Sequence, residues 1–188
     1  RPFSMLLEII TFVLDVVVGF VAGACLLRLF MQHQRVPFGN PVGRMVFALT
    51  DWAVLPLRRV VPAAGRWDLA SLVAALLLEL AQYALLWLLL GASATVLAVP
   101  LLAVFGLARL VLSGLIGLVL VFAVLSWVQP GSPVLHVLGR LCEPLLRPLR
   151  RFIPLVGGVD LSPLVVMVLL QVGLIVLSSL QRSVLAAL

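Results

Sequence analysis

Four apolar stretches, each long enough to cross a lipid bilayer, dominate this sequence. They cover residues 5–31, 69–90, 107–128 and 161–180, and a helix of about 20 mostly apolar residues spans the hydrocarbon core. The chain is 64% hydrophobic and 11% charged, whereas a typical soluble domain is about 45–50% apolar and about a quarter charged. A soluble domain of 188 residues cannot bury that much apolar surface. The sequence therefore predicts an all-α membrane protein with four transmembrane helices.

Residues 92–105 form a further apolar segment in front of the third stretch. Pro100 and Gly106 divide this region from the helix that follows, and the segment is short for the thickness of the hydrocarbon core. We therefore predict a re-entrant or interfacial piece that leads into the third helix, with a fifth short span as the alternative.

The first stretch contains Ala-Gly-Ala-Cys at residues 22–25, which is similar to a lipoprotein cleavage site. The apolar run continues past Cys25 and exceeds the apolar core of about 7–15 residues in a signal peptide. The first stretch is therefore predicted to be a membrane helix, with Cys25 as a small buried residue.

The basic residues show how the chain is oriented in the membrane. All 13 are arginines, and the formal net charge is +6. Nine of them lie in two loops, at residues 32–68 and 129–160, and none lies in the connection at 91–100. The positive-inside rule places both basic loops in the cytoplasm and both termini outside. The basic charge is thus interpreted as a topology signal, and no direct binding of nucleic acid is predicted.

The two basic loops are copies of each other. Residues 40–73 align with residues 132–165 at a constant offset of 92, and 13 of the 34 positions are identical. The centre of the match is PLRRVVPAAGRWDL in the first copy and PLRRFIPLVGGVDL in the second. Each half is therefore a helix, a basic hairpin and a helix, and both halves cross the membrane in the same direction. This parallel repeat divides the chain into units at residues 1–91 and 92–188.

Each copy of the loop begins with the signature of a short helix. Asn40-Pro41 and Ser132-Pro133 each combine an N-cap residue with proline at the first helical position. The apolar spacing that follows is typical of an amphipathic helix lying in the membrane interface, and the next proline is predicted to end it. The arginine pair after that proline is then expected at headgroup depth, in contact with anionic lipid or a partner. These contact residues are Arg58, Arg59, Arg150 and Arg151.

A turn and a helix cap complete each copy. The chain is predicted to reverse between a proline and a glycine, and an aspartate then precedes the next apolar stretch. A carboxylate at this position accepts hydrogen bonds from free backbone N–H groups and meets the positive end of the helix dipole. The motif residues are Pro56, Pro62, Gly65 and Asp68 in the first copy and Pro148, Pro154, Gly157 and Asp160 in the second.

The duplicated pattern N/S-P…[DE]…P-L-R-R-x-x-P-x-x-G-x-x-D-x-[SA]-[PS] resembles that of the bacterial YggT family, whose plastid and Gram-positive relatives are called YlmG. The resemblance covers essentially the whole chain. The first copy departs from the family pattern at residues 52–55, Trp-Ala-Val-Leu, where the second copy keeps Pro-Leu-Leu-Arg at 144–147. The resemblance implies an inner-membrane protein. It also implies associations with osmotic and potassium stress, with division-gene neighbourhoods and, in plastids, with cytochrome b haem assembly and nucleoid distribution.

Acidic residues inside the predicted spans cost about 2.5–3.5 kcal/mol each on insertion scales, so each is a functional candidate. Glu8, Asp15 and Glu79 are such residues, with Arg109 as the basic residue well inside the spans. We expect Glu8 or Asp15 to pair with Arg109 and lock the first helix to the third, with an ion or proton site as the alternative. Glu79, whose repeat equivalent is Gln171, is either a neutral packing residue or a proton carrier.

No residue pattern indicates catalysis, a metal site or a cofactor. His33 and His136 lie in loops at non-equivalent positions, which argues against haem ligation, and no Cys/His spacing fits zinc. We therefore predict no catalytic residue, no metal, no cofactor and no enzymatic activity. Gly19 and Gly23 form a G-x-x-x-G motif, which usually marks close helix packing and raises a homodimer as a further hypothesis.

These features predict a non-enzymatic scaffold or assembly factor of the bacterial inner membrane that uses two Arg-rich cytoplasmic hairpins. Its expected partners are the lipid bilayer, anionic lipid headgroups and an unidentified membrane protein. The alternative is an ion or solute transporter or channel in osmotic potassium homeostasis, relying on Asp15, Glu79 and Arg109.

Overall fold

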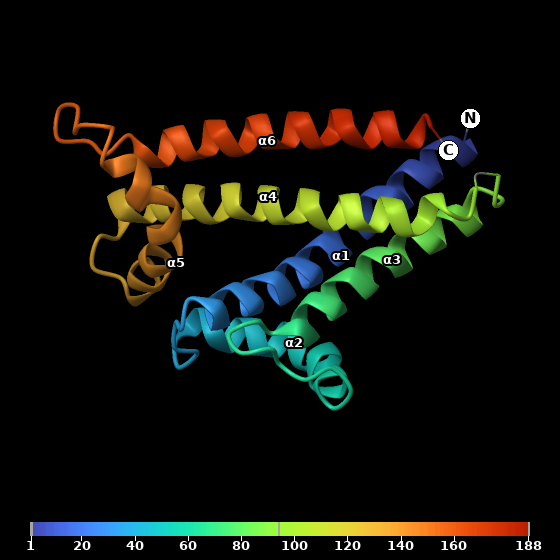
Figure 1. Ribbon diagram of the computed structural model, residues 1–188, viewed down its shortest axis with the longest axis horizontal. Helices are drawn as coiled ribbons and strands as arrows, with labels where there is room; N and C mark the ends of the chain where they lie inside the picture. The colour runs from blue at the N-terminus through green and yellow to red at the C-terminus, as the bar shows by residue number, and fades with distance from the viewer. Residues whose placement is uncertain (1, 94, 188) are drawn as a thin grey trace.

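In the computed structural model, which describes residues 2–93 and 95–187, the protein is built from helices joined by short loops (Figure 1). The elements are, in chain order, α1 (Pro2–His33), α2 (Pro41–Arg58), α3 (Leu69–Leu89), α4 (Ala98–Val128), α5 (Pro133–Arg150) and α6 (Ser162–Leu185). Four of them, α1, α3, α4 and α6, are long and apolar enough to cross a membrane. The expected all-α fold with four transmembrane helices is confirmed.

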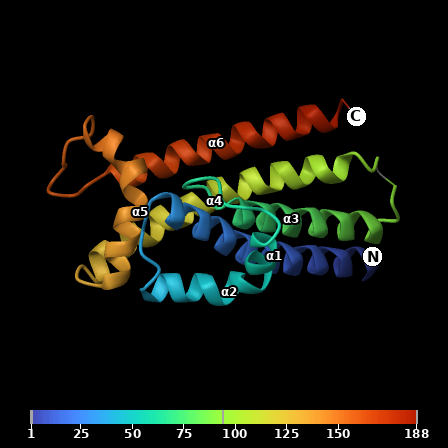
Figure 2. The ribbon, with the colours of Figure 1, turned by 60° about the horizontal axis from the view of Figure 1, so that its bottom comes forward.

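The four long helices run between two ends of the molecule. Both termini and the connection between α3 and α4 lie at one end, while α2 and α5 lie across the other end with the loops that follow them (Figures 1 and 2). We call the end that carries α2 and α5 the hairpin end. The order long helix, short helix, hairpin, long helix occurs twice, so both basic hairpins lie on one side of the bundle.

Helix α4 differs from the sequence-based expectation. It is continuous over 31 residues, or about 46 Å at 1.5 Å per residue, so Pro100 and Gly106 do not divide it. Pro100 lies in the first turn, where the N–H that proline lacks would have no helical partner. Gly106 lies inside the helix, where its missing Cβ makes room for the Glu79 and Tyr83 side chains of α3. The separate re-entrant, interfacial or fifth-span segment predicted over 92–105 is therefore wrong from Ala98 onward.

The short helices begin as predicted but end later. Asn40 and Ser132 are the N-caps of α2 and α5, and the side chain of each accepts a hydrogen bond from the backbone N–H three residues later. Pro56 and Pro148 do not end these helices, which continue to Arg58 and Arg150. Each proline lies in the last turn of its helix, and the chain after Pro56 closes with short-range bonds, such as the Arg59 N–H to the Pro56 carbonyl at 3.3 Å.

The long helices pack against each other within each half and also between the halves. Helix α1 packs on α3 and α4 packs on α6, while α3 packs on α4 across the repeat boundary. Gly19 and Gly23 face Leu110 of α4 at 4.0 and 3.9 Å from their ideal Cβ positions. The G-x-x-x-G motif thus serves helix packing within one chain, and a homodimer stays a prediction.

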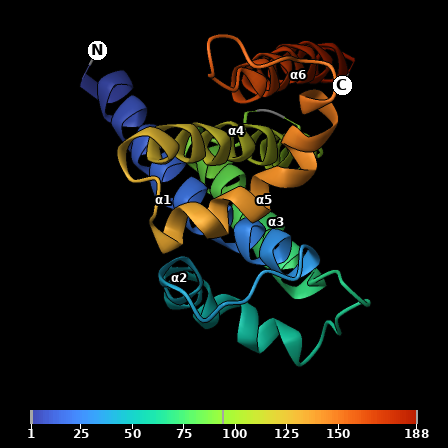
Figure 3. The same cartoon turned by 90° about the vertical axis from the view of Figure 1, so that its left-hand side faces the viewer.

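A buried cluster holds the two short helices against each other at the hairpin end. Met31 of α1, Val46 of α2 and Leu141 of α5 are fully buried in this cluster. Figure 3, which looks onto this end, shows α2 and α5 side by side below the end of α4. The two hairpins therefore have fixed positions relative to each other.

Candidate functional site

The two turns of the basic hairpins have the same backbone geometry. Gly65 and Gly157 have φ angles of +62° and +61°, in the left-handed region that glycine adopts without strain. Each glycine follows one member of a short antiparallel bridge, which pairs Ala64 with Trp67 in the first copy and Val156 with Val159 in the second. The repeat in the sequence is therefore a repeat in structure, down to the turn.

An arginine–aspartate ion pair closes each hairpin. Arg58 donates to Asp68 at 2.6 Å, and Arg150 donates to Asp160 at 2.9 Å. Each aspartate also accepts from the start of the next long helix: Asp68 from the Ser71 N–H at 3.4 Å and Asp160 from the Ser162 N–H at 2.9 Å. Asp68 is the N-cap of α3 as predicted, whereas the N-cap of α6 is Leu161, and Asp160 accepts from the first N–H of that helix from one residue earlier. One carboxylate joins each short helix to the membrane helix that follows.

The two aspartates differ in burial. The Asp68 side chain is 1% exposed and that of Asp160 is 31% exposed. Burial raises the pKa of Asp68, but the hydrogen bonds from Arg58 and Ser71 outweigh it and hold this pKa below its usual value. The pKa of Asp160 is lowered in the same way, because hydrogen bonds from Ser162 and Arg150 outweigh a smaller effect of burial. Both carboxylates are therefore charged anchors at neutral pH.

Arg28 of α1 is a further member of the first site that the sequence analysis did not single out. Its side chain is 2% exposed, and it donates to Thr50 at 2.8 Å and to Asp51 at 2.6 Å. It lies 3.8 Å from Asp68 and 4.6 Å from the centre of the Phe47 ring. Arg28 thus connects α1 to α2 and to the start of α3, and its charge is buried between these elements.

The second half uses a different arrangement for the same task. The position equivalent to Arg28 is Leu120, and the position equivalent to Asp51 is Glu143. Arg150 donates to both Glu143 at 3.3 Å and Asp160 at 2.9 Å. One arginine therefore holds both acids in the second half, whereas Arg58 and Arg28 share them in the first. The repeat comparison gave no signal for Arg28 because its equivalent is apolar.

The second arginine of each pair is placed differently from the first. Arg59 and Arg151 are exposed and form no ion pair within the described residues. Apolar side chains beside them are also exposed, with Val60 at 80% and Phe152 at 82%. Each hairpin therefore presents an unpaired cation next to an exposed apolar tip.

The polar residues of the spans form separate contacts. Gln82 donates to Asp15, and Glu79 is buried against Gly106. Arg109 donates to Gln181 of α6 at 2.9 Å. The expected ion pair of Arg109 with Glu8 or Asp15 is wrong, because Arg109 lies on the side of α4 that faces α6, in a cavity that Gln181 and Arg182 also line.

The histidines are also separated. The His33 ring packs against Trp67 at a tilt of 34°, with 4.4 Å between ring centres, and His136 lines a cavity beside α5. Within residues 2–93 and 95–187, no group of three or more His, Cys, Asp and Glu side chains is arranged to hold a metal ion.

Comparison with known proteins agrees with the duplicated geometry. The family model described as CCB3/YggT matches this chain twice, over residues 7–89 and 101–181. The chain belongs to the CCB3/YggT family. It is 39% identical over 169 residues to the YggT protein of Escherichia coli strain K12, which covers 87% of this chain and 86% of that protein. A Vibrio alginolyticus protein from the proC 3′ region is 35% identical over 149 residues, covering 78% of this chain and 80% of the relative.

A Pseudomonas aeruginosa relative is 35% identical over 143 residues, covering 74% of this chain and 73% of that protein. No solved structure matches this chain. The expected YggT membership with two repeats is therefore confirmed by sequence, and the chain is a multi-pass membrane protein of this family.

Proposed function

We propose that this YggT-family protein is a non-enzymatic membrane scaffold or assembly factor whose working surfaces are its two hairpins. The observation that carries the proposal is the division of labour within each arginine pair. Arg58 and Arg150 are held by aspartates inside the fold, while Arg59 and Arg151 are left exposed beside apolar tips. A helix end that presents a cation next to an exposed apolar side chain suits both lipid headgroups and a docking protein.

We place the hairpins in the cytoplasm, against the inner membrane of a bacterium, because the positive-inside rule favours that side for loops rich in arginine. There, Arg59 and Arg151 would each gain about 1 kcal/mol near anionic lipid. Lipid contact alone does not need the fixed frame of proline, glycine and aspartate, so we further propose a membrane protein as partner.

Transport of an ion or solute is the second candidate function. It rests on Glu79, which is buried in α3, and on Asp15, which accepts from Gln82. Against it, the equivalent of Glu79 is Gln171, which is exposed on α6, and Arg109 contacts a different helix from these acids. Within the described residues, Arg109 thus forms no ion pair with Asp15 or Glu79, and the acid at position 79 has no acidic counterpart in the second half, whereas transporters built from repeats place a shared site between their halves.

Site-specific photocrosslinking in living cells tests the scaffold proposal. Replacing Phe152 by p-benzoylphenylalanine keeps an aromatic ring at the exposed hairpin tip, and we expect a discrete adduct with one membrane protein. Because Arg151 is the adjacent unpaired cation, Arg151→Gln is expected to reduce that adduct about fivefold or more. Arg147→Gln, an exposed charge one turn earlier in the same copy, is the matched control and is expected to keep it. An adduct that responds equally to both variants, or none, would reject the proposed docking surface.

A further inference from the structure

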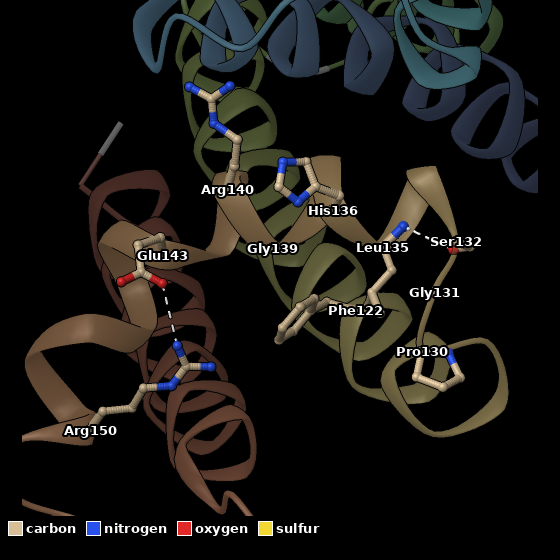
Figure 4. A pocket seen from close by; sticks show the side chains of 10 residues that line it. All are labelled: Phe122, Pro130, Gly131, Ser132, Leu135, His136, Gly139, Arg140, Glu143 and Arg150. Atoms are coloured by element: carbon tan, nitrogen blue, oxygen red, sulfur yellow. Dashed lines mark hydrogen bonds and ion pairs between the residues drawn. The ribbon is translucent and has the colours of Figure 1, made fainter.

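The second repeat contains a cavity of about 620 Å³ beside α5, at the hairpin end of α4. Phe122, Leu135 and Gly139 give it an apolar wall, and His136, Arg140 and Arg150 lie around it. In Figure 4 the Phe122 ring lies between these polar groups, with His136 and Arg140 on one side and Arg150 on the other. The cavity is therefore amphipathic, with an apolar wall and a charged rim that also includes Glu143.

The first repeat has large side chains at the equivalent positions. At the constant offset of 92, the equivalent of Gly139 is Phe47 and the equivalent of Pro130 is Phe38. The rings of Phe38 and Phe47 stack with their centres 4.7 Å apart, and Arg28 lies over Phe47. Two aromatic rings thus occupy the positions of the first repeat where the second repeat has Pro130, Gly139 and the cavity.

Glycine at position 139 keeps the cavity open. An ideal Cβ built on Gly139 lies 3.4 Å from the ring of Phe122, so a methyl group would just fit and a larger side chain would have to extend into the open space. In the first repeat, the corresponding side of α2 is also closed at Gly43, where the ideal Cβ position lies 2.6 Å from the Phe38 Cα. The loop before α2 therefore lies directly on that helix.

One charge at the cavity, Arg140, is specific to the second repeat. Arg140 replaces the Ala48 of the first repeat, is exposed, and has no ion pair among the described residues. Arg150 is shared between Glu143 and Asp160. Because Arg150 is paired with two acids, Arg140 is the lining charge that has no counter-charge among the described residues, and its guanidinium keeps all its donors for an outside group.

The depth of the cavity indicates what fills it. Helix α4 ends at Val128, two residues before the lining residue Pro130, so the cavity lies where a membrane span meets the headgroup layer. A ligand at this depth meets water on one side and lipid tails on the other. The apolar wall and the free arginine both match a molecule that carries a phosphate next to a hydrocarbon chain.

We propose that this cavity is a binding site for one anionic phospholipid, present in the second repeat and absent from the first. The Arg140 guanidinium binds the phosphodiester, with His136 beside it, and the glycerol and first acyl carbons lie against Phe122 and Leu135. Arginine suits this role because its planar donors bind two phosphate oxygens at once. The site goes beyond the proposed docking function, since it needs no protein partner.

Native mass spectrometry of the full chain in detergent tests this site by titration with phosphatidylglycerol. We expect a first molecule of phosphatidylglycerol to bind at a lower lipid concentration than any further molecules. Arg140→Ala is expected to weaken this first binding event about tenfold or more, as expected for loss of a charged hydrogen bond. Gly139→Phe introduces the residue that the first repeat has at the equivalent position, and we expect it to abolish this binding event. Arg147→Ala removes the same charge from the same helix outside the cavity and is expected to leave it unchanged.

Three results would overturn the site. In the first, Arg140→Ala and Arg147→Ala weaken lipid binding equally, which reduces the effect to net charge. In the second, phosphatidylcholine binds as tightly as phosphatidylglycerol. In the third, inorganic phosphate displaces the lipid at equal concentration, which would make the cavity a site for free phosphate. Because Arg140 is exposed, its alanine variant is expected to fold normally, and a thermal unfolding curve checks this.

Discussion

Replacing Arg28 by leucine is expected to destabilise the protein by about 3 kcal/mol, the cost typical of removing one partner from a buried ion pair. The guanidinium is 2% exposed and contacts Thr50, Asp51 and Asp68. Without it, Thr50 loses its donor and the two carboxylates lose a shared counter-charge. Leucine is the residue that the second repeat has at the equivalent position, so the side chain itself suits a membrane helix.

Equilibrium unfolding in mixed micelles of a mild detergent and dodecyl sulfate measures this change. Arg44→Leu is the matched control, because Arg44 lies exposed on α2 and forms no ion pair in the described part of the chain. Its unfolding free energy is expected to stay within about 0.5 kcal/mol of the wild type, as for most surface substitutions. Equal stability of the Arg28 and Arg44 variants would contradict the role given to Arg28.

The second large effect is an asymmetry between the two capping aspartates. Asp68→Asn is expected to cost about 3 kcal/mol, because it leaves the buried Arg28 and the neighbouring Arg58 with too little negative charge. Asp160→Asn is expected to cost about 1 kcal/mol or less, since Asp160 is 31% exposed and water screens its ion pair. Both variants keep an oxygen that can accept the backbone N–H at the start of the next helix, so the difference isolates the charge.

Thermal unfolding of both variants in the same detergent gives the comparison. The unfolding temperature is expected to fall from wild type to Asp160→Asn and again from Asp160→Asn to Asp68→Asn. The second decrease is expected to be the larger one. If the two variants unfold together, the burial of the first ion-pair network has no energetic consequence and the structural distinction between the halves fails.

Much of this architecture could be predicted because it depends on local signals. The four apolar stretches, the Asn40 and Ser132 caps and the Asp68 cap all follow from residues close in sequence, and the structure contains them. The repeat added the two turns, since matching glycines and aspartates at one offset imply matching geometry. The assignment of Asp68 and Asp160 to arginine partners required the fold, because the sequence indicated anionic lipid or a partner as contacts of the arginine pairs.

What could not be predicted depends on tertiary packing. From the sequence alone, Pro100 indicates the end of a helix, but it lies in the first turn of α4, where a helix tolerates proline. Arg28 lies near the end of an apolar run and has an apolar repeat equivalent, so neither hydropathy nor the repeat pointed to it. A charge inside an apolar run is itself a signal, and that rule alone would have found Arg28.

The differences between the halves are as informative as the repeat. Each half keeps the short helix, the turn and the Arg–Asp pair, so these features serve a shared role at the hairpin end. The first half adds the buried Arg28 network and the Phe38–Phe47 stack, and the second half has a cavity in place of the stack. The first half is thus more closely packed at the hairpin end, whereas the second half has an open cavity there.

The central claim is that this protein acts through its hairpins and not through a path across its membrane core. Purified protein in liposomes, with potassium and proton flux recorded under an imposed gradient, tests that claim most directly. We predict flux equal to that of protein-free liposomes, and equal again for Glu79→Gln. Flux clearly above that background in the wild-type protein, abolished by Glu79→Gln at the same amount of inserted protein, would contradict the claim and assign the function to the core.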